Sequence, residues 1–119
     1  MARFLVLPRD PSGSWDEVSP AEMQRIVEKY VAWGGKLAEA GRLEGREKLE
    51  DGDGRVLGGE GAALRVTNGP FAEAKEVIGG FWILKADDYD DAVRLVSDCP
   101  HLAFGSLEIR QIEEMSADA

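Results

Sequence analysis

The pattern of apolar and polar positions predicts a chain in which strands and helices alternate. Short apolar runs at residues 3–7 and 81–84 are typical of buried strands. Between them, apolar residues recur at helical spacing over residues 20–40, directly after Ser19, which is a favourable N-cap before a proline. The same spacing predicts a second helix over residues 88–97.

The remaining segments complete a two-layer architecture. Residues 42–49 and 106–112 predict two further strands, and residues 55–57 and 63–67 predict a hairpin. The simplest reduction of this order is β-α-β-β-α-β. It predicts an α+β fold, with one antiparallel sheet and two helices packed on one face.

One stretch combines a rigid turn with charged side chains. Asn68 and Gly69 tolerate turn conformations, and Pro70 suits the first position of a helix. We expect a short helix over residues 72–77, which a glycine pair then ends. This arrangement holds three charged side chains beside the turn: Glu73, Lys75 and Glu76.

The same stretch carries a family resemblance. Residues 66–76, Val-Thr-Asn-Gly-Pro-Phe-Ala-Glu-Ala-Lys-Glu, resemble the signature of the YCII-related family, whose members are also called DGPF-domain proteins. Residues 87–99 resemble the family's second helix, and residues 105–110 resemble its closing strand. The resemblance implies a ferredoxin-like domain that pairs into a homodimer of the dimeric α/β-barrel type. Asn68 stands where the family usually has Asp, and an amide cannot act as an acid or base.

Composition narrows the classes of function. We expect one domain over residues 1–119, with a frayed acidic tail at 113–119. The net charge of −9 argues against nucleic-acid binding through a basic face. We find neither a signal peptide nor a stretch that could span a bilayer, so we expect a cytoplasmic protein. The single cysteine, Cys99, excludes an intrachain disulfide, and we expect a buried, unreactive thiol.

Three residues are candidates for acid–base catalysis. His101 is the only histidine and titrates near neutral pH, although a lone loop histidine is more often a surface or capping residue. Glu73 and Glu76 match family positions, and neighbouring carboxylates raise each other's pKa. The alternative is that these charges only solvate an exposed helix. We expect one of the two glutamates to face a cleft that His101 can reach.

Five further residues are candidates for ligand binding. Trp15 either caps a hydrophobic edge or forms the aromatic wall of a cleft. Arg110 either pairs with Glu108 on the last strand or receives a substrate carboxylate. The others belong to the signature stretch: Asn68, which we expect to cap the turn, Phe71 and Lys75. We find no metal-binding motif and expect no cofactor.

Two hypotheses about function follow. The first is a binding protein that holds a small organic molecule near the signature stretch and has a regulatory or accessory role. The second is a cofactor-free enzyme that uses Glu73 or Glu76 with His101. The family resemblance alone suggests a link to sigma factors of transcription. We expect a homodimer, formed through a sheet face to which Trp33 and Trp82 add aromatic area.

Overall fold

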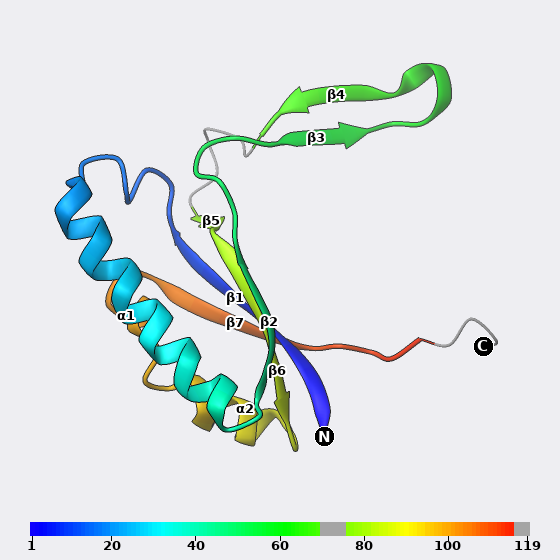
Figure 1. Ribbon diagram of the computed structural model, residues 1–119. Coiled ribbons are helices and arrows are strands. Elements are labelled where there is room, and N and C mark those ends of the chain that lie inside the picture. The colour runs from blue at the N-terminus through cyan, green and yellow to red at the C-terminus, as the bar shows by residue number, and fades with distance from the viewer. Residues whose placement is uncertain (70–75, 116–119) are drawn as a thin grey trace.

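The computed structural model describes residues 1–69 and 76–115 (Figure 1). The strands and helices along the described chain are β1 (Ala2–Pro11), α1 (Pro20–Glu39), β2 (Leu43–Lys48), β3 (Arg55–Gly58), η1 (Gly61–Ala63), β4 (Arg65–Asn68), β5 (Glu76–Ile78), β6 (Gly80–Ala86), α2 (Tyr89–Val96), η2 (Pro100–Ala103) and β7 (Ser106–Gln111).

Strand β1 is the centre of the main sheet, and all its neighbours run antiparallel to it. It pairs with β6 through residues 2–6 and with β7 through residues 4–9, and β2 pairs with the far edge of β6. The described residues therefore form the predicted α+β class, with two α-helices and an antiparallel sheet, consistent with a ferredoxin-like fold.

Strands β5 and β6 lie along the same edge of β1, separated by a bulge. Arg9 pairs with Ser106 of β7 on one edge, so its pairing with Ile78 of β5 must use the other edge, which is the edge of β6. Residues 79–81 then lie opposite only residues 7–8 of β1, between the Ile78 and Trp82 pairings. One extra residue in a strand is a β-bulge, which bends the strand locally.

One hydrophobic core joins the helices to alternate positions of the central strands. Its buried members are Phe4 and Val6 of β1, Trp82, Leu84 and Ala86 of β6, Trp33 and Leu37 of α1, Ala92 and Val96 of α2, and Cys99. The two tryptophan rings pack edge to face, with centroids 5.2 Å apart. The expectation that they add to an uncovered sheet face is therefore wrong, because both rings lie under the helices.

Side-chain caps fix the starts of both helices, and the cap at Ser19 was predicted. The hydroxyl of Ser19 accepts a hydrogen bond from the N–H of Glu22 at 3.1 Å, so α1 begins at Pro20. The carboxylate of Asp88 accepts one from the N–H of Asp91 at 2.8 Å at the start of α2. After α1, Gly41 adopts a φ of 73°, a left-handed conformation that favours glycine and ends the helix.

The predicted helix over residues 72–77 is wrong at its C-terminal end. Glu76 and Val77 belong to β5 and pair with Pro11 and Asp10 of β1, while residues 70–75 lie outside the described chain. β1 extends beyond the predicted apolar run and offers these residues a pairing partner. Tertiary pairing therefore overrides the helix propensity of the segment.

The predicted hairpin forms a separate two-stranded ribbon. β3 and β4 pair with each other, from Arg55 opposite Asn68 to Gly58 opposite Arg65, and the ribbon extends away from the main sheet (Figure 1).

Among the described residues, no helix is long and apolar enough to cross a membrane.

Candidate functional site

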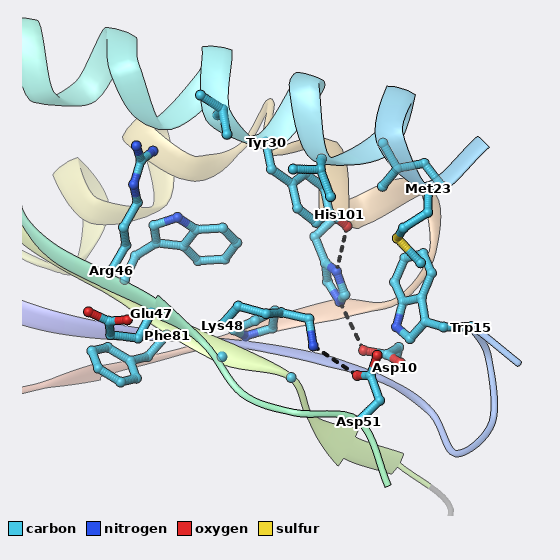
Figure 2. A pocket seen from close by; sticks show the side chains of 17 residues that line it. Asp10, Trp15, Met23, Tyr30, Arg46, Glu47, Lys48, Asp51, Phe81 and His101 are labelled. Atoms are coloured by element: carbon cyan, nitrogen blue, oxygen red, sulfur yellow. Dashed lines mark hydrogen bonds and ion pairs between the residues drawn. The ribbon is translucent and has the colours of Figure 1, made fainter. Parts of the chain in front are cut away.

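A cavity of about 370 Å³ lies between α1 and the sheet strands β1, β2 and β6. Figure 2 shows aromatic rings along it, among them Trp15 from the loop after β1 and Tyr30 from α1. Residues from both ends of the chain meet there, since Asp10 and His101 line the same cavity. A volume of this size is typical of sites for small organic molecules.

His101 is buried, with 2% of its surface exposed, so the surface position expected of a lone loop histidine is wrong. Its Nε2 lies 2.9 Å from the carbonyl oxygen of Arg9, and its Nδ1 lies 3.0 Å from the hydroxyl of Tyr30. A carbonyl oxygen only accepts hydrogen bonds, so Nε2 carries a proton. In the neutral ring Nδ1 then accepts from Tyr30, and both ring nitrogens are satisfied.

Asp10 is the second buried polar group of the site, with 2% of its surface exposed. Its Oδ1 lies 3.9 Å from Nε2 of His101. Burial raises the pKa of the Asp10 carboxyl, and this effect outweighs the opposing effects of His101 and of the Trp15 indole N–H. A carboxyl whose pKa is raised towards neutrality is suited to giving and taking protons.

The sequence pattern did not single out Asp10, because this residue stands between two prolines and beyond the apolar run at residues 3–7. The structure continues β1 through this segment, and the buried side chains alternate from Phe4 through Val6 and Pro8 to Asp10. The alternation of buried and exposed residues along the strand, if it is continued past Pro8, therefore places Asp10 on the buried face. Tyr30 was predicted only as part of the helix face, and burial raises the pKa of its hydroxyl.

Two of the predicted site residues, Trp15 and His101, line this cavity. The ring of Trp15 also packs against Phe104, with centroids 5.0 Å apart. The cysteine next to this site, Cys99, is buried as expected, and burial raises its pKa to about 11. Its sulfur is therefore a protonated thiol at neutral pH.

The structure does not bring Glu76 to His101. The carboxylate of Glu76 lies 3.2 Å from Nε of Arg9, and it lines a neighbouring hollow rather than the cavity. Arg9 and Asp10 are adjacent on β1, so their side chains point to opposite faces of the sheet. The carboxylate of Glu76 is thus held on the side of Arg9.

Two other predicted residues lie away from the cavity. Arg110 is exposed on β7, where its Nη1 lies 3.4 Å from Oε2 of Glu108, which is the structural pair considered for it. Asn68 ends β4 on the hairpin and is exposed. The backbone N–H groups that it was expected to cap lie outside the described residues. The other three candidates also lie outside them: Phe71, Glu73 and Lys75.

Comparisons with known proteins identify a family. A family model described as YCII-related domain matches residues 2–116. No curated protein matches the sequence. Among solved structures, a similar one is 5-chloro-2-hydroxyhydroquinone dehydrochlorinase from Burkholderia phenoliruptrix in complex with 2,5-dihydroxybenzoquinone, with 16% sequence identity, a TM-score of 0.47 and 95% of each chain covered.

Proposed function

Because the chain belongs to the YCII-related family, we propose that it binds a small organic molecule in the cavity beneath α1. The observation that carries this proposal is the carboxyl of Asp10, which is buried in the cavity wall beside His101. A buried carboxyl costs stability unless hydrogen bonds compensate for the water that it has lost. A ligand that bonds to the carboxyl would supply this compensation. The regulatory or accessory role, including a link to sigma factors, rests on the family resemblance and stays a prediction.

A thermal-shift screen of metabolite pools tests this binding. We expect compounds that raise the melting temperature of the wild type to lose their effect in Trp15→Ala, which shortens the aromatic wall. The matched control is Tyr89→Ala, because Tyr89 is an exposed aromatic residue that lies outside the cavity. Hits that stabilise both variants as well as the wild type would contradict a ligand in this cavity.

A second candidate function is cofactor-free acid–base catalysis, with Asp10 in the role first considered for the glutamates. The raised pKa of Asp10 favours it. In such a reaction, the Asp10 carboxylate takes a proton from a carbon next to a carbonyl group. The O–H bond forms as the C–H bond breaks, and the electron pair passes into an enolate, which regains a proton from Asp10.

Hydrogen exchange separates binding from catalysis. A hit from the screen that has an acidic C–H group should exchange that hydrogen for deuterium in D₂O, as followed by proton NMR, when the wild type is present. We expect Asp10→Asn to abolish the exchange, because an amide cannot take the proton. Equal exchange with the wild type and this variant would contradict catalysis by Asp10.

We also propose that two copies pair through the sheet face opposite the core, as in a dimeric α/β barrel. Trp82 points into the core, so its neighbours Phe81 and Ile83 point the other way, as do Leu5 and Leu7 of β1. All four apolar side chains are partly exposed in the single chain, and a second copy would cover them.

Light scattering measures this association directly. We expect a mass of twice 13.0 kDa for the wild type and a monomer for Ile83→Asp. Val93→Asp is the control, because Val93 is an exposed apolar residue on α2 with 52% of its surface accessible. A wild-type monomer at micromolar concentration would overturn the dimer.

A further inference from the structure

Arg46 lies at the end of the cavity away from Asp10 and His101 (Figure 2). It is opposite Trp82 in the pairing of β2 with β6, so its side chain leaves the sheet on the side of α1. There its guanidinium packs against Gly34, where the Cβ of any other residue would collide with Nη1 of Arg46. The exposed side chain of Arg46 thus lies over the middle of α1.

Within the described residues, no carboxylate pairs with the guanidinium of Arg46. The other cation that lines the cavity, Lys48, is bound to Asp51 at 2.8 Å. The chain has 23 acidic and 14 basic residues, so acidic partners are plentiful. Arg25 and Arg65 also have no carboxylate partner in the described part of the chain, but neither of them lines the cavity.

The acidic residue next to Arg46 faces a different way. Glu47 also contributes to the lining, but it follows Arg46 on β2 and pairs with Phe81, so its side chain points to the opposite side of the strand. The guanidinium of Arg46 therefore lies at one end of the cavity, while the Lys48–Asp51 ion pair lies near Asp10 at the other. At that other end also lies a cluster made of a carboxyl, an imidazole and a hydroxyl group from Asp10, His101 and Tyr30.

Aromatic rings lie between these two ends. Tyr30 and Trp82 pack edge to face, with centroids 6.4 Å apart, and both line the cavity. Such walls favour a planar, apolar body over a flexible or highly hydrated one. A cavity of about 370 Å³ accommodates a molecule with one or two rings.

We infer that the ligand is a planar organic anion of the aromatic or enolic carboxylate class. Its carboxylate lies on the guanidinium of Arg46, its body packs against Tyr30 and Trp82, and a hydroxyl or keto oxygen at its far end meets Asp10. A guanidinium matches a carboxylate with two parallel hydrogen bonds, which makes Arg46 the specificity-determining group of the site. This inference rests on the proposed function and adds the charge of the ligand to it.

Matched probes test whether the negative charge of the ligand matters, separately from whether the cavity binds a ligand at all. Calorimetry compares 4-hydroxybenzoate with 4-hydroxybenzamide, and 4-hydroxycinnamate with its amide, because each pair differs in charge but hardly in shape. We expect each anion to bind the wild type about tenfold more tightly than its amide, the size of effect of one charged hydrogen-bonded pair. In Arg46→Met this preference should disappear, while the affinity for the amides stays within about twofold.

The control is Arg65→Met, which removes the same charge from an arginine on the hairpin, outside the cavity. It should keep the tenfold preference. Anions and amides that bind the wild type equally well would overturn the inference and leave the proposed cavity standing. Failure of all four probes to bind at millimolar concentration would overturn this ligand class, while the metabolite screen decides separately whether the cavity binds a small molecule. A preference that Arg65→Met loses as fully as Arg46→Met would overturn the role of Arg46.

Discussion

The carbonyl oxygen of Arg9 lies 2.9 Å from Nε2 of His101, and this contact fixes which ring nitrogen carries the proton. It ties the imidazole to the backbone of β1, while Tyr30 occupies the other ring nitrogen at 3.0 Å. Both ring nitrogens of His101 are therefore engaged by groups of the protein. The neighbouring Asp10 is then the group best placed to meet a ligand.

Tyr30→Phe should destabilise the fold through His101. The variant keeps the ring but removes the hydroxyl that bonds Nδ1, which leaves a buried polar atom unsatisfied. We expect a loss of about 1–3 kcal/mol in the free energy of unfolding, measured by urea denaturation. Tyr89→Phe is the comparison, because that hydroxyl is exposed on α2 and water can replace it, so its loss should be smaller. Equal losses would contradict the buried bond.

Asp10→Asn should stabilise the protein at neutral pH. Burial raises the folded-state pKa of Asp10 above its ordinary value of 3.8, so the folded state binds the proton more tightly than the unfolded state. The wild type therefore loses stability as the pH rises from about 3.8 through the raised pKa, and the amide avoids this loss.

Urea midpoints between pH 3.5 and pH 8 measure this difference. The advantage of Asp10→Asn should be present at pH 7 and shrink as the pH falls towards 3.8. Asp51→Asn, at an exposed residue that lines the same cavity, provides the control. A midpoint for Asp10→Asn that stays below the wild type at every pH would refute the assignment.

Asp91→Asn should have the opposite effect on stability and destabilise the protein at neutral pH. The N–H of Asp87, followed by Arg94 and Arg42, lowers the pKa of Asp91 to about 2, so the ionised carboxylate stabilises the fold. This stability is present above about 3.8 and is lost as the pH falls through about 2. We expect Asp91→Asn to lower the urea midpoint at pH 7 and to match the wild type near pH 2. Asp90→Asn, in the same helical turn, should change the midpoint much less.

Two glycines should respond to alanine in opposite ways. A Cβ on Gly35 of α1 meets nothing within 4 Å, so Gly35→Ala should stabilise the protein by up to about 1 kcal/mol through helix propensity. A Cβ on Gly105 would collide with the backbone carbonyl of Arg9, the group that holds His101. Gly105→Ala should therefore destabilise by about 1–3 kcal/mol in urea denaturation. An unchanged free energy of unfolding for Gly105→Ala would show that β1 and the start of β7 can move apart to accommodate the methyl group.

The sequence by itself determined the elements and the class of fold, because these depend on local patterns. The cap at Ser19 and the apolar period after it predict α1 to within one residue of its observed end at Glu39. The apolar runs predict β1 and β6, although β1 is longer than its apolar run, and the strand predicted over residues 106–112 corresponds to β7. The signature over residues 66–76 indicated the family, which the match over residues 2–116 confirms.

Only the tertiary structure decided which side chains meet. Asp10, Tyr30 and His101 are far apart along the chain, and they come together because β7 pairs with β1 while α1 lies close to η2. The same pairing explains the error at Glu76, since a local propensity carries no information about a distant strand that offers hydrogen bonds. Helix caps and the period of an apolar face are set by neighbours in sequence. A site is set by neighbours in space, which only the packed chain defines.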